Sequence, residues 1–297
     1  MRIRKRGKIC DGLWFFGWEE SCVYLLEGKN RSLLINGGFS CLIPDLLRQL
    51  ESSGIDESRI NALLVLHSHF DHVGIVPFFK LRHPDMVVYS SPRALEIFKK
   101  PKAIQVINTS SRYITESRGL SEVCSAYDLD WWTGIEGGAV SEGDRIDLGD
   151  LEVHIIETPG HSLCSISAYV PQMKALFPSD AGGVPLGERI VIDGTSNFTK
   201  FEESLQKLKG LEVEYLCSDH YGYVTGADAG AFISDSIEAA KRRRCLMEEA
   251  YKRTGDLEEA ARQLASLFRY ENSANIVPNE VYLQSQRRMI MNVVGLA

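Results

Sequence analysis

The sequence lacks the features of membrane-spanning, secreted and disulfide-stabilised proteins. None of its apolar runs is long enough to cross a bilayer, and the basic start MRIRKRGKIC is followed by Asp11, Glu19 and Glu20 instead of the apolar stretch of a signal peptide. The seven cysteines are scattered and form no C-x-x-C pair, which is typical of reduced thiols. We therefore expect a cytoplasmic protein with no membrane partner and with its basic start as a solvated edge strand.

The chain also has no excess of positive charge and no low-complexity segment. Its 33 Lys and Arg residues against 40 Asp and Glu residues give a net charge of -7, and an acidic surface repels a phosphate backbone. We therefore expect no nucleic-acid partner. The 297 residues, of which 44% are hydrophobic, suffice for a large buried core.

Short strand patterns dominate the first three quarters of the chain. Residues 60–66 (INALLVL) are continuously apolar, as in a central strand covered on both faces. Other strands are expected within 8–36 and near 86–89, 145–148, 151–156, 165–170, 175–177 and 213–217, and helices near 44–53, 73–81, 91–118 and 199–208. Each half runs from strands into helices, which predicts an α/β fold with two packed sheets and outer helices, an αββα sandwich.

The pattern changes after Gly226. Residues 227–297 contain almost no strand pattern and carry apolar residues at helical spacing in three segments. We expect residues 1–225 to form the sandwich and residues 226–297 an all-helical C-terminal cap. Residues 121–138 are expected to be an irregular insertion, whose Trp131-Trp132 could either line a pocket or anchor the loop to the core.

Histidine and aspartate residues follow the predicted strands closely. The motif His67-Ser68-His69-Phe70-Asp71-His72 comes directly after the strand at 60–66. His161, Asp180 and His220 follow three further predicted strands, in Thr158-Pro159-Gly160-His161, Ser179-Asp180 and Asp219-His220. Strand ends at one rim of an α/β sheet are where ligand sites gather. His83 and His154 fall outside this pattern.

These residue types in this arrangement indicate a metal centre. A single histidine is usually a core or surface residue, but four His and Asp side chains within six residues would be costly to crowd together without a cation. Imidazole and carboxylate ligands suit two divalent ions, zinc first, with iron or manganese as alternatives.

These motifs resemble those of the metallo-β-lactamase superfamily, in order and spacing, over roughly residues 8–225. The resemblance implies that His67, His69 and His161 bind one metal, that Asp71, His72 and His220 bind the second, and that Asp180 bridges them. An Asp at this position is typical of the glyoxalase II, lactonase and thioesterase side of the superfamily. The family usually has Asp where this chain has Asn36.

More narrowly, the appended helices and the ending Ser285-Gln286-Arg287-Arg288-Met289 resemble thioesterase-like response proteins of quinolone signalling. That resemblance implies helices that cover the metal site, a contribution of Ser285 to substrate binding, and a homodimer through the C-terminal helices. Lys241-Arg242-Arg243-Arg244 could then be a solvated helix face, a dimer contact, or a phosphate contact to coenzyme A.

The predicted activity is metal-dependent hydrolysis of a small-molecule acyl substrate, a thioester, ester or lactone, with acyl-coenzyme A as one candidate. Two cations would activate a shared water, with Asp71 as the catalytic residue that orients it and Tyr221 or Tyr223 close to the substrate. Phosphodiester or RNA hydrolysis, mono-iron sulfur dioxygenation and a regulatory role through the surface remain alternatives, because one scaffold hosts many chemistries.

Overall fold

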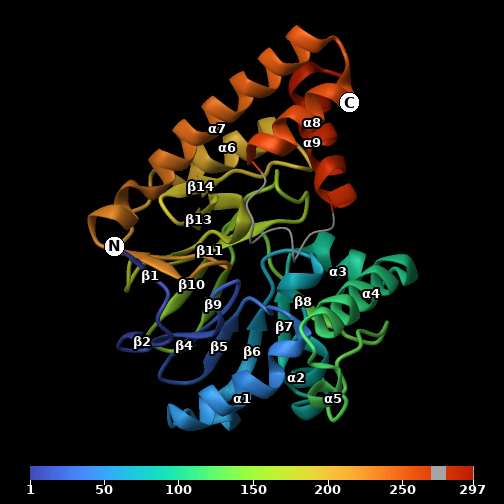
Figure 1. The fold of residues 1–297 in the computed structure, drawn as a ribbon. Helices are drawn as coiled ribbons and strands as arrows, with labels where there is room; N and C mark the ends of the chain where they lie inside the picture. Colours follow the sequence, from blue (N-terminus) through green and yellow to red (C-terminus); the bar gives the residue numbers. More distant parts are fainter. Residues whose placement is uncertain (269–278, 297) are drawn as a thin grey trace.

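Two sheets lie face to face between two sets of helices in the computed structural model, which describes residues 1–268 and 279–296 (Figure 1). The first sheet has the order β2 (Gly7–Cys10), β3 (Leu13–Trp18), β4 (Ser21–Glu27), β5 (Ser32–Ile35), β6 (Ile60–Leu64), β7 (Val87–Ser90) and β8 (Gly137–Ala139). The second has the order β1 (Arg2–Ile3), β16 (Tyr223–Thr225), β15 (Tyr215–Cys217), β12 (Ala175–Phe177), β11 (Ile166–Val170), β10 (Glu152–Glu157) and β9 (Arg145–Asp147).

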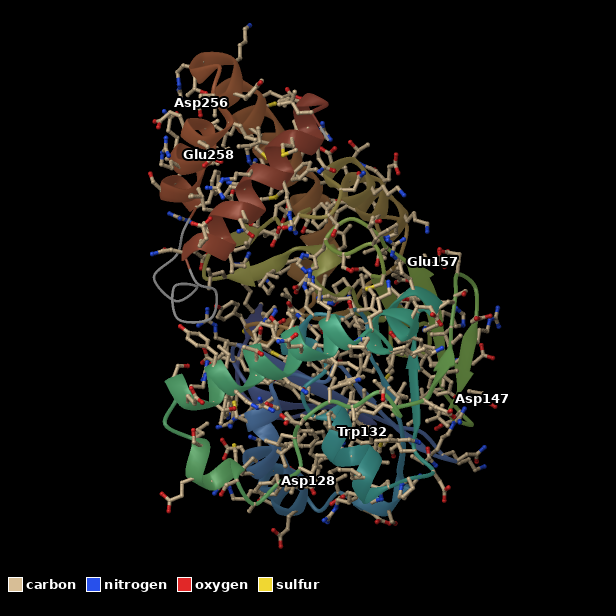
Figure 2. All side chains as sticks on the ribbon, turned by 90° about the vertical axis from the view of Figure 1, so that its right-hand side faces the viewer. Asp128, Trp132, Asp147, Glu157, Asp256 and Glu258 are labelled. Carbon is tan, nitrogen blue, oxygen red and sulfur yellow. The ribbon has the colours of Figure 1, made fainter. Side chains whose placement is uncertain are left out.

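Helices cover the outer face of each sheet (Figure 1). The first sheet carries α1 (Ile43–Ser52), α2 (Val76–Arg82), α3 (Pro92–Phe98), α4 (Pro101–Ser117) and the short α5 (Ser121–Cys124). The second carries α6 (Phe198–Leu208), α7 (Ala227–Thr254), α8 (Leu257–Phe268) and α9 (Asn279–Val294). The predicted αββα sandwich and the helical C-terminal segment are confirmed. Figure 2 shows Asp256 and Glu258 at the outer end of that segment and Trp132 in the opposite half.

The three buried layers follow from the two-residue alternation of the strands. In β4, Cys22, Tyr24 and Leu26 face the second sheet, whereas Val23 and Leu25 face the helices of the first. In β6, Ala62 and Leu64 face the second sheet and Leu63 faces the helices, so its continuous apolar sequence reflects burial on both faces. A third core lies between the second sheet and α6 to α9. Within the described residues, no helix combines the length and apolar character needed to span a bilayer.

Two local features differ from the sequence-based expectation. The single helix expected over 91–118 is two helices, because Pro101 holds Lys100 in an extended conformation (ψ 120°) and cannot donate a helical hydrogen bond. The hairpin of β13 (Val184–Leu186) and β14 (Arg189–Val191) was not predicted. The basic start contains an edge strand as expected: β1 pairs with β16, and the exposed residues 4–6 then pass from the second sheet to the first.

The turn before His161 depends on a glycine. Gly160 has φ +146°, and an added Cβ would lie 2.3 Å from Cα of Phe201 in α6. Its carbonyl accepts hydrogen bonds from the backbone N–H groups of Ser196 and Asn197. The absence of a side chain therefore lets this turn approach α6 and sets the position of His161.

We predict that Gly160→Ala lowers the free energy of unfolding by at least about 2 kcal/mol, since it adds a clash with backbone to an unfavourable φ. Gly210→Ala is the matched control, because no atom lies within 4 Å of its added Cβ. Urea unfolding monitored by circular dichroism measures both. Equal unfolding free energies for the two variants would show that the turn accommodates a side chain.

Candidate metal centre

Seven side chains from four strand ends converge at one rim of the sandwich. His67 follows β6, and His69, Asp71 and His72 lie in the next turn, where residues 70–72 form a short 3-10 helix. His161 follows β10, Asp180 follows β12, and His220 follows β15. The predicted convergence of distant motifs is therefore present in the fold.

The first group consists of His67, His69 and His161. One ring nitrogen from each lies within 4.8 Å of the other two. His161 Nε2 and His69 Nδ1 are 3.0 Å apart. His67 and His161 are buried, whereas His69 is exposed and lies at the open side of the group. This arrangement offers three nitrogen lone pairs to one cation, which suits a zinc-like site.

The second group consists of Asp71, His72 and His220, whose ligand atoms also lie within 4.8 Å of one another. Asp71 Oδ2 is 3.5 Å from His72 Nε2 and 3.7 Å from His220 Nε2. His72 is fully buried and the other two are partly buried. The group thus offers two imidazoles and one carboxylate.

Asp180 lies between the two groups. Its Oδ2 is 3.3 Å from His161 Nε2 and 3.4 Å from His72 Nε2, and its Oδ1 is 3.5 Å from His220 Nε2. A single carboxylate therefore contacts histidines of both groups. This is the geometry of a bridging ligand between two cations.

A buried hydrogen-bond network supports two of the histidines from behind. Asp219 Oδ2 accepts a hydrogen bond from Ser179 Oγ at 2.6 Å and lies 3.0 Å from His72 Nδ1. Ser179 Oγ lies 3.0 Å from His67 Nδ1, and Asn36 Oδ1 lies 3.1 Å from His72 Nδ1. Because the Ser179 proton goes to Asp219, the hydroxyl accepts from His67 Nδ1–H, and both imidazoles direct Nε2 toward the centre.

Backbone carbonyls orient two more histidines in the same way. His161 Nδ1 donates to the carbonyl of Asp193 at 2.9 Å, and His220 Nδ1 donates to the carbonyl of Glu20 at 2.7 Å. Hydrogen bonds on Nδ1 thus fix the ring orientation of four of the five histidines, with Nε2 directed inward.

Burial and the neighbouring charges shift the pKa values at the centre strongly. Burial, aided by His72 and His69, holds the pKa of His67 well below its usual range. Burial would also lower the pKa of His220, but the Asp180 carboxylate outweighs it and raises that pKa to about 9. Burial would raise the pKa of Asp180, yet His220, His72 and His161 hold it well below its usual range. Positive charge is therefore favoured around Asp180.

The inward-facing atoms fit metal ions better than any partner within the protein. His67 Nε2, His72 Nε2 and Asp180 Oδ1 are buried and have no hydrogen-bond partner. Leaving such atoms unsatisfied costs about 1–3 kcal/mol each, a cost that coordination removes. A third possible ligand group, His67, His72 and Asp219, involves the nitrogens already engaged by the buried network.

The structure separates the residues suggested as substrate contacts. Tyr221 has φ +62° and its ring centroid lies 6.4 Å from that of His220. Tyr223 instead belongs to the core between the sheets and packs edge-on against Phe15 at 6.2 Å; this favours packing over substrate contact. Ser285 lies on α9, where its Oγ accepts a hydrogen bond from Gln286 Nε2 at 3.3 Å, and no contact with the seven metal-site candidates is seen in the described part of the chain.

Several other residues serve the fold. Trp131 is buried against Phe98 at 4.6 Å, and its backbone N–H and carbonyl both bind the side chain of Asn108. This favours the loop-anchoring interpretation. His83 pairs with Glu57 and His154 with Glu152, both outside the centre.

The sequence analysis did not identify four supporting residues. Asp219 and Ser179 directly precede the candidate ligands His220 and Asp180, so adjacency was the only available signal. Asp193 and Glu20 act through backbone carbonyls, for which the side-chain type carries no signal.

Two cavities share a wall residue with these supports. One, of about 610 Å³, includes Glu20. The other, of about 640 Å³, lies between α7, α9 and the β13–β14 hairpin and includes Asp193. Each cavity therefore includes a residue whose carbonyl supports a candidate ligand, His220 for the first and His161 for the second.

We predict that Asp219→Asn weakens metal affinity by about 10–100-fold, because a neutral amide replaces the acceptor that orients His72 and Ser179. Competition with a chromophoric chelator measures the affinity. Asp85→Asn is the control, because Asp85 is exposed. An affinity equal to that of the unmodified protein would show that the buried network does not support the centre.

Comparison with known proteins places this geometry in a family. The profile of the metallo-β-lactamase superfamily matches residues 17–220. The hydroxyacylglutathione hydrolase of Rhodopseudomonas palustris is 32% identical over 210 residues, covering 71% of this chain and 66% of that protein. The acyl-coenzyme A thioesterase MBLAC2 of Gallus gallus is 27% identical over 249 residues, covering 76% and 82%.

The matches differ in how much of each protein they include. The chain spans 43% to 66% of the length of the first three hydroxyacylglutathione hydrolases that it matches. A β-lactamase domain protein from Burkholderia ambifaria shares the fold, with a TM-score of 0.70 at 13% identity over 100% of this chain and 89% of that one. Since the family profile covers more than half of the sequence and includes every candidate ligand, the chain belongs to the metallo-β-lactamase superfamily.

Proposed function

We propose that this protein is a metal-dependent hydrolase of acyl thioesters, with esters and lactones as related substrates. The observation that carries the proposal is the position of the Asp180 carboxylate, buried between two groups of inward-facing histidines. The similarity to a hydroxyacylglutathione hydrolase and to an acyl-coenzyme A thioesterase supports the choice of thioester. Fold alone would not, because this architecture hosts many chemistries.

We assign the candidate ligands to two cations. His67, His69 and His161 would hold the first, Asp71, His72 and His220 the second, and Asp180 would contact both. Two divalent ions held by these residues would supply a water whose pKa is lowered toward neutrality. Zinc is our first choice, since imidazole and carboxylate ligands suit it well, and iron or manganese are alternatives.

The chain's own residues contribute orientation and proton handling. Asp219, Asn36 and the carbonyls of Asp193 and Glu20 keep each imidazole aimed at the centre. Asp71 is partly buried at the second group, and we assign it to orient the attacking water and take up its proton. Tyr221 is the remaining candidate for a contact with the acyl oxygen.

We expect hydrolysis to depend entirely on bound metal. Removing metal with a chelator should abolish thioesterase activity, and adding back zinc, iron or manganese should restore it, with the best metal identified by activity per bound ion. The measurement is the rate of hydrolysis of a panel of acyl-coenzyme A thioesters, lactones and phosphodiesters. A parallel assay measures oxygen consumption in the presence of a persulfide. Preferential cleavage of phosphodiesters, or oxygen uptake, would replace thioester hydrolysis as the function.

We predict that His69→Ala reduces kcat/KM by at least about 1000-fold, because it removes one of three nitrogens from the first group. The exposed position of His69 means that circular dichroism and the unfolding midpoint should change little. His154→Ala, which removes a histidine outside the centre, should retain activity. Full activity of the His69 variant would contradict the proposed site.

A further inference from the structure

Four cationic side chains gather in a cavity beside the metal centre. The cavity has a volume of about 610 Å³, and its lining includes Arg4, Lys5, Arg6 and Arg118 together with Glu19 and Glu20. The first three belong to the basic start of the chain, which the sequence analysis assigned to a solvated edge strand. A cavity of this size is typical of a small-molecule site.

The charges in the cavity do not cancel. Arg4 pairs with Glu19 at 3.1 Å, and Arg118 pairs with Glu20 at 2.6 Å. Within the described ranges of the chain, no carboxylate lies within ion-pair distance of Lys5 or Arg6, and the only hydrogen bond seen for either runs from Arg6 Nη1 to the carbonyl of Gly17 at 3.3 Å. Two positive charges therefore remain available, which favours an anionic ligand.

The cavity wall touches the second ligand group through its backbone. The carbonyl of Glu20 binds His220 Nδ1 at 2.7 Å, and the carbonyl of Glu19 accepts a hydrogen bond from the N–H of Tyr221. The guanidinium of Arg4 lies 5.8 Å from the ring centroid of Tyr221. A ligand in the cavity would therefore lie on the His220 side of the centre.

A second path of contacts leads from Arg118 to the same group. The Arg118 guanidinium lies 5.4 Å from the centroid of Phe39, which stacks on Phe70 at 6.1 Å, and Phe70 directly precedes Asp71. Two residues of the cavity lining, Glu20 and Arg118, thus connect to residues of the second group.

Three of the four cations in the other basic cluster of the chain are engaged within the protein. Lys241 pairs with Glu238 at 2.7 Å, and Arg244 pairs with Glu202 at 2.6 Å. Arg243 is buried, with a hydrogen bond to Gln286 and its guanidinium over the ring of Phe268. These cations stabilise the packing of α7 against its neighbours.

We propose that the cavity lined by Arg4, Lys5, Arg6 and Arg118 binds phosphate groups on the thiol carrier of the substrate, as found in coenzyme A. This inference rests on the proposed thioesterase function and names its substrate class. Guanidinium and ammonium groups bind phosphate oxygens through short, charge-assisted hydrogen bonds. Phosphate binding here directs the thioester toward the metal centre and leaves the metal ligands free for the reacting carbonyl.

Equilibrium binding of free coenzyme A tests the site without turnover. In the metal-loaded protein, Lys5→Gln with Arg6→Gln should weaken binding by roughly tenfold or more, the effect of losing one or two charge-assisted hydrogen bonds. Arg93→Gln with Lys252→Gln removes the same two residue types from exposed positions of α3 and α7 outside both cavities and should leave binding unchanged. Isothermal titration calorimetry measures all three proteins. Undetectable binding to the unmodified protein, or equal binding to all three, would overturn the inference.

Steady-state kinetics provide the second readout. For a coenzyme A thioester, the Lys5→Gln/Arg6→Gln protein should show a KM raised roughly tenfold with a nearly unchanged kcat. The same acyl group on uncharged N-acetylcysteamine should be hydrolysed equally by variant and unmodified protein. A loss confined to acylglutathione, or an equal loss for every thioester, would overturn phosphate recognition. If the unmodified protein hydrolyses no thioester at all, the proposed function fails, and calorimetry still decides whether the cavity binds coenzyme A.

Discussion

The structure depends above all on the electrostatic compensation of a buried carboxylate and the imidazole nitrogens that face it. Asp180 contacts histidines of both groups, and it is buried together with His67, His72 and His161. Their mutual repulsion and desolvation would oppose folding unless cations, or protons in their place, occupy the centre. Metal binding therefore also stabilises the folded conformation of this rim.

The sandwich provides the rigidity that this balance requires. The strands β6, β12 and β15 that precede ligands are largely buried. Hydrogen bonds also join the two sheets near the rim, from the N–H of Ile166 to the carbonyl of Leu66 and from the N–H of Cys22 to the carbonyl of Asp219. Ligands from both sheets are thus held at fixed separation. Behind them, Asp219 and Ser179 connect histidines of the same centre through one buried network.

Charge is distributed unevenly around this centre despite the acidic composition of the chain. Cations of the C-terminal helices are largely paired with carboxylates or buried against neighbours, whereas the basic start of the chain lines a cavity beside His220. Net charge alone therefore misrepresents the local potential that a substrate meets. The pairing of β1 with β16 is what brings these residues to the metal rim, because Ile3 lies opposite Tyr223, three residues after His220.

The sequence by itself determined the layer architecture, the family and the candidate ligands. The burial of β6 follows from its continuously apolar sequence, and His67 to His72 lie so close in the chain that any strand–turn conformation brings them together. Only the tertiary structure decided which groups orient the histidines, because Asp193 and Glu20 act through carbonyls, and Asp219 meets His72 from 147 residues away. It also decided that Tyr221 lies near His220 whereas Tyr223 packs in the core between the sheets. Turn and strand residues so close in the chain face different surroundings once the sheets pack. The position of Lys5 and Arg6 was likewise decided by strand pairing across the whole chain, which no local pattern encodes.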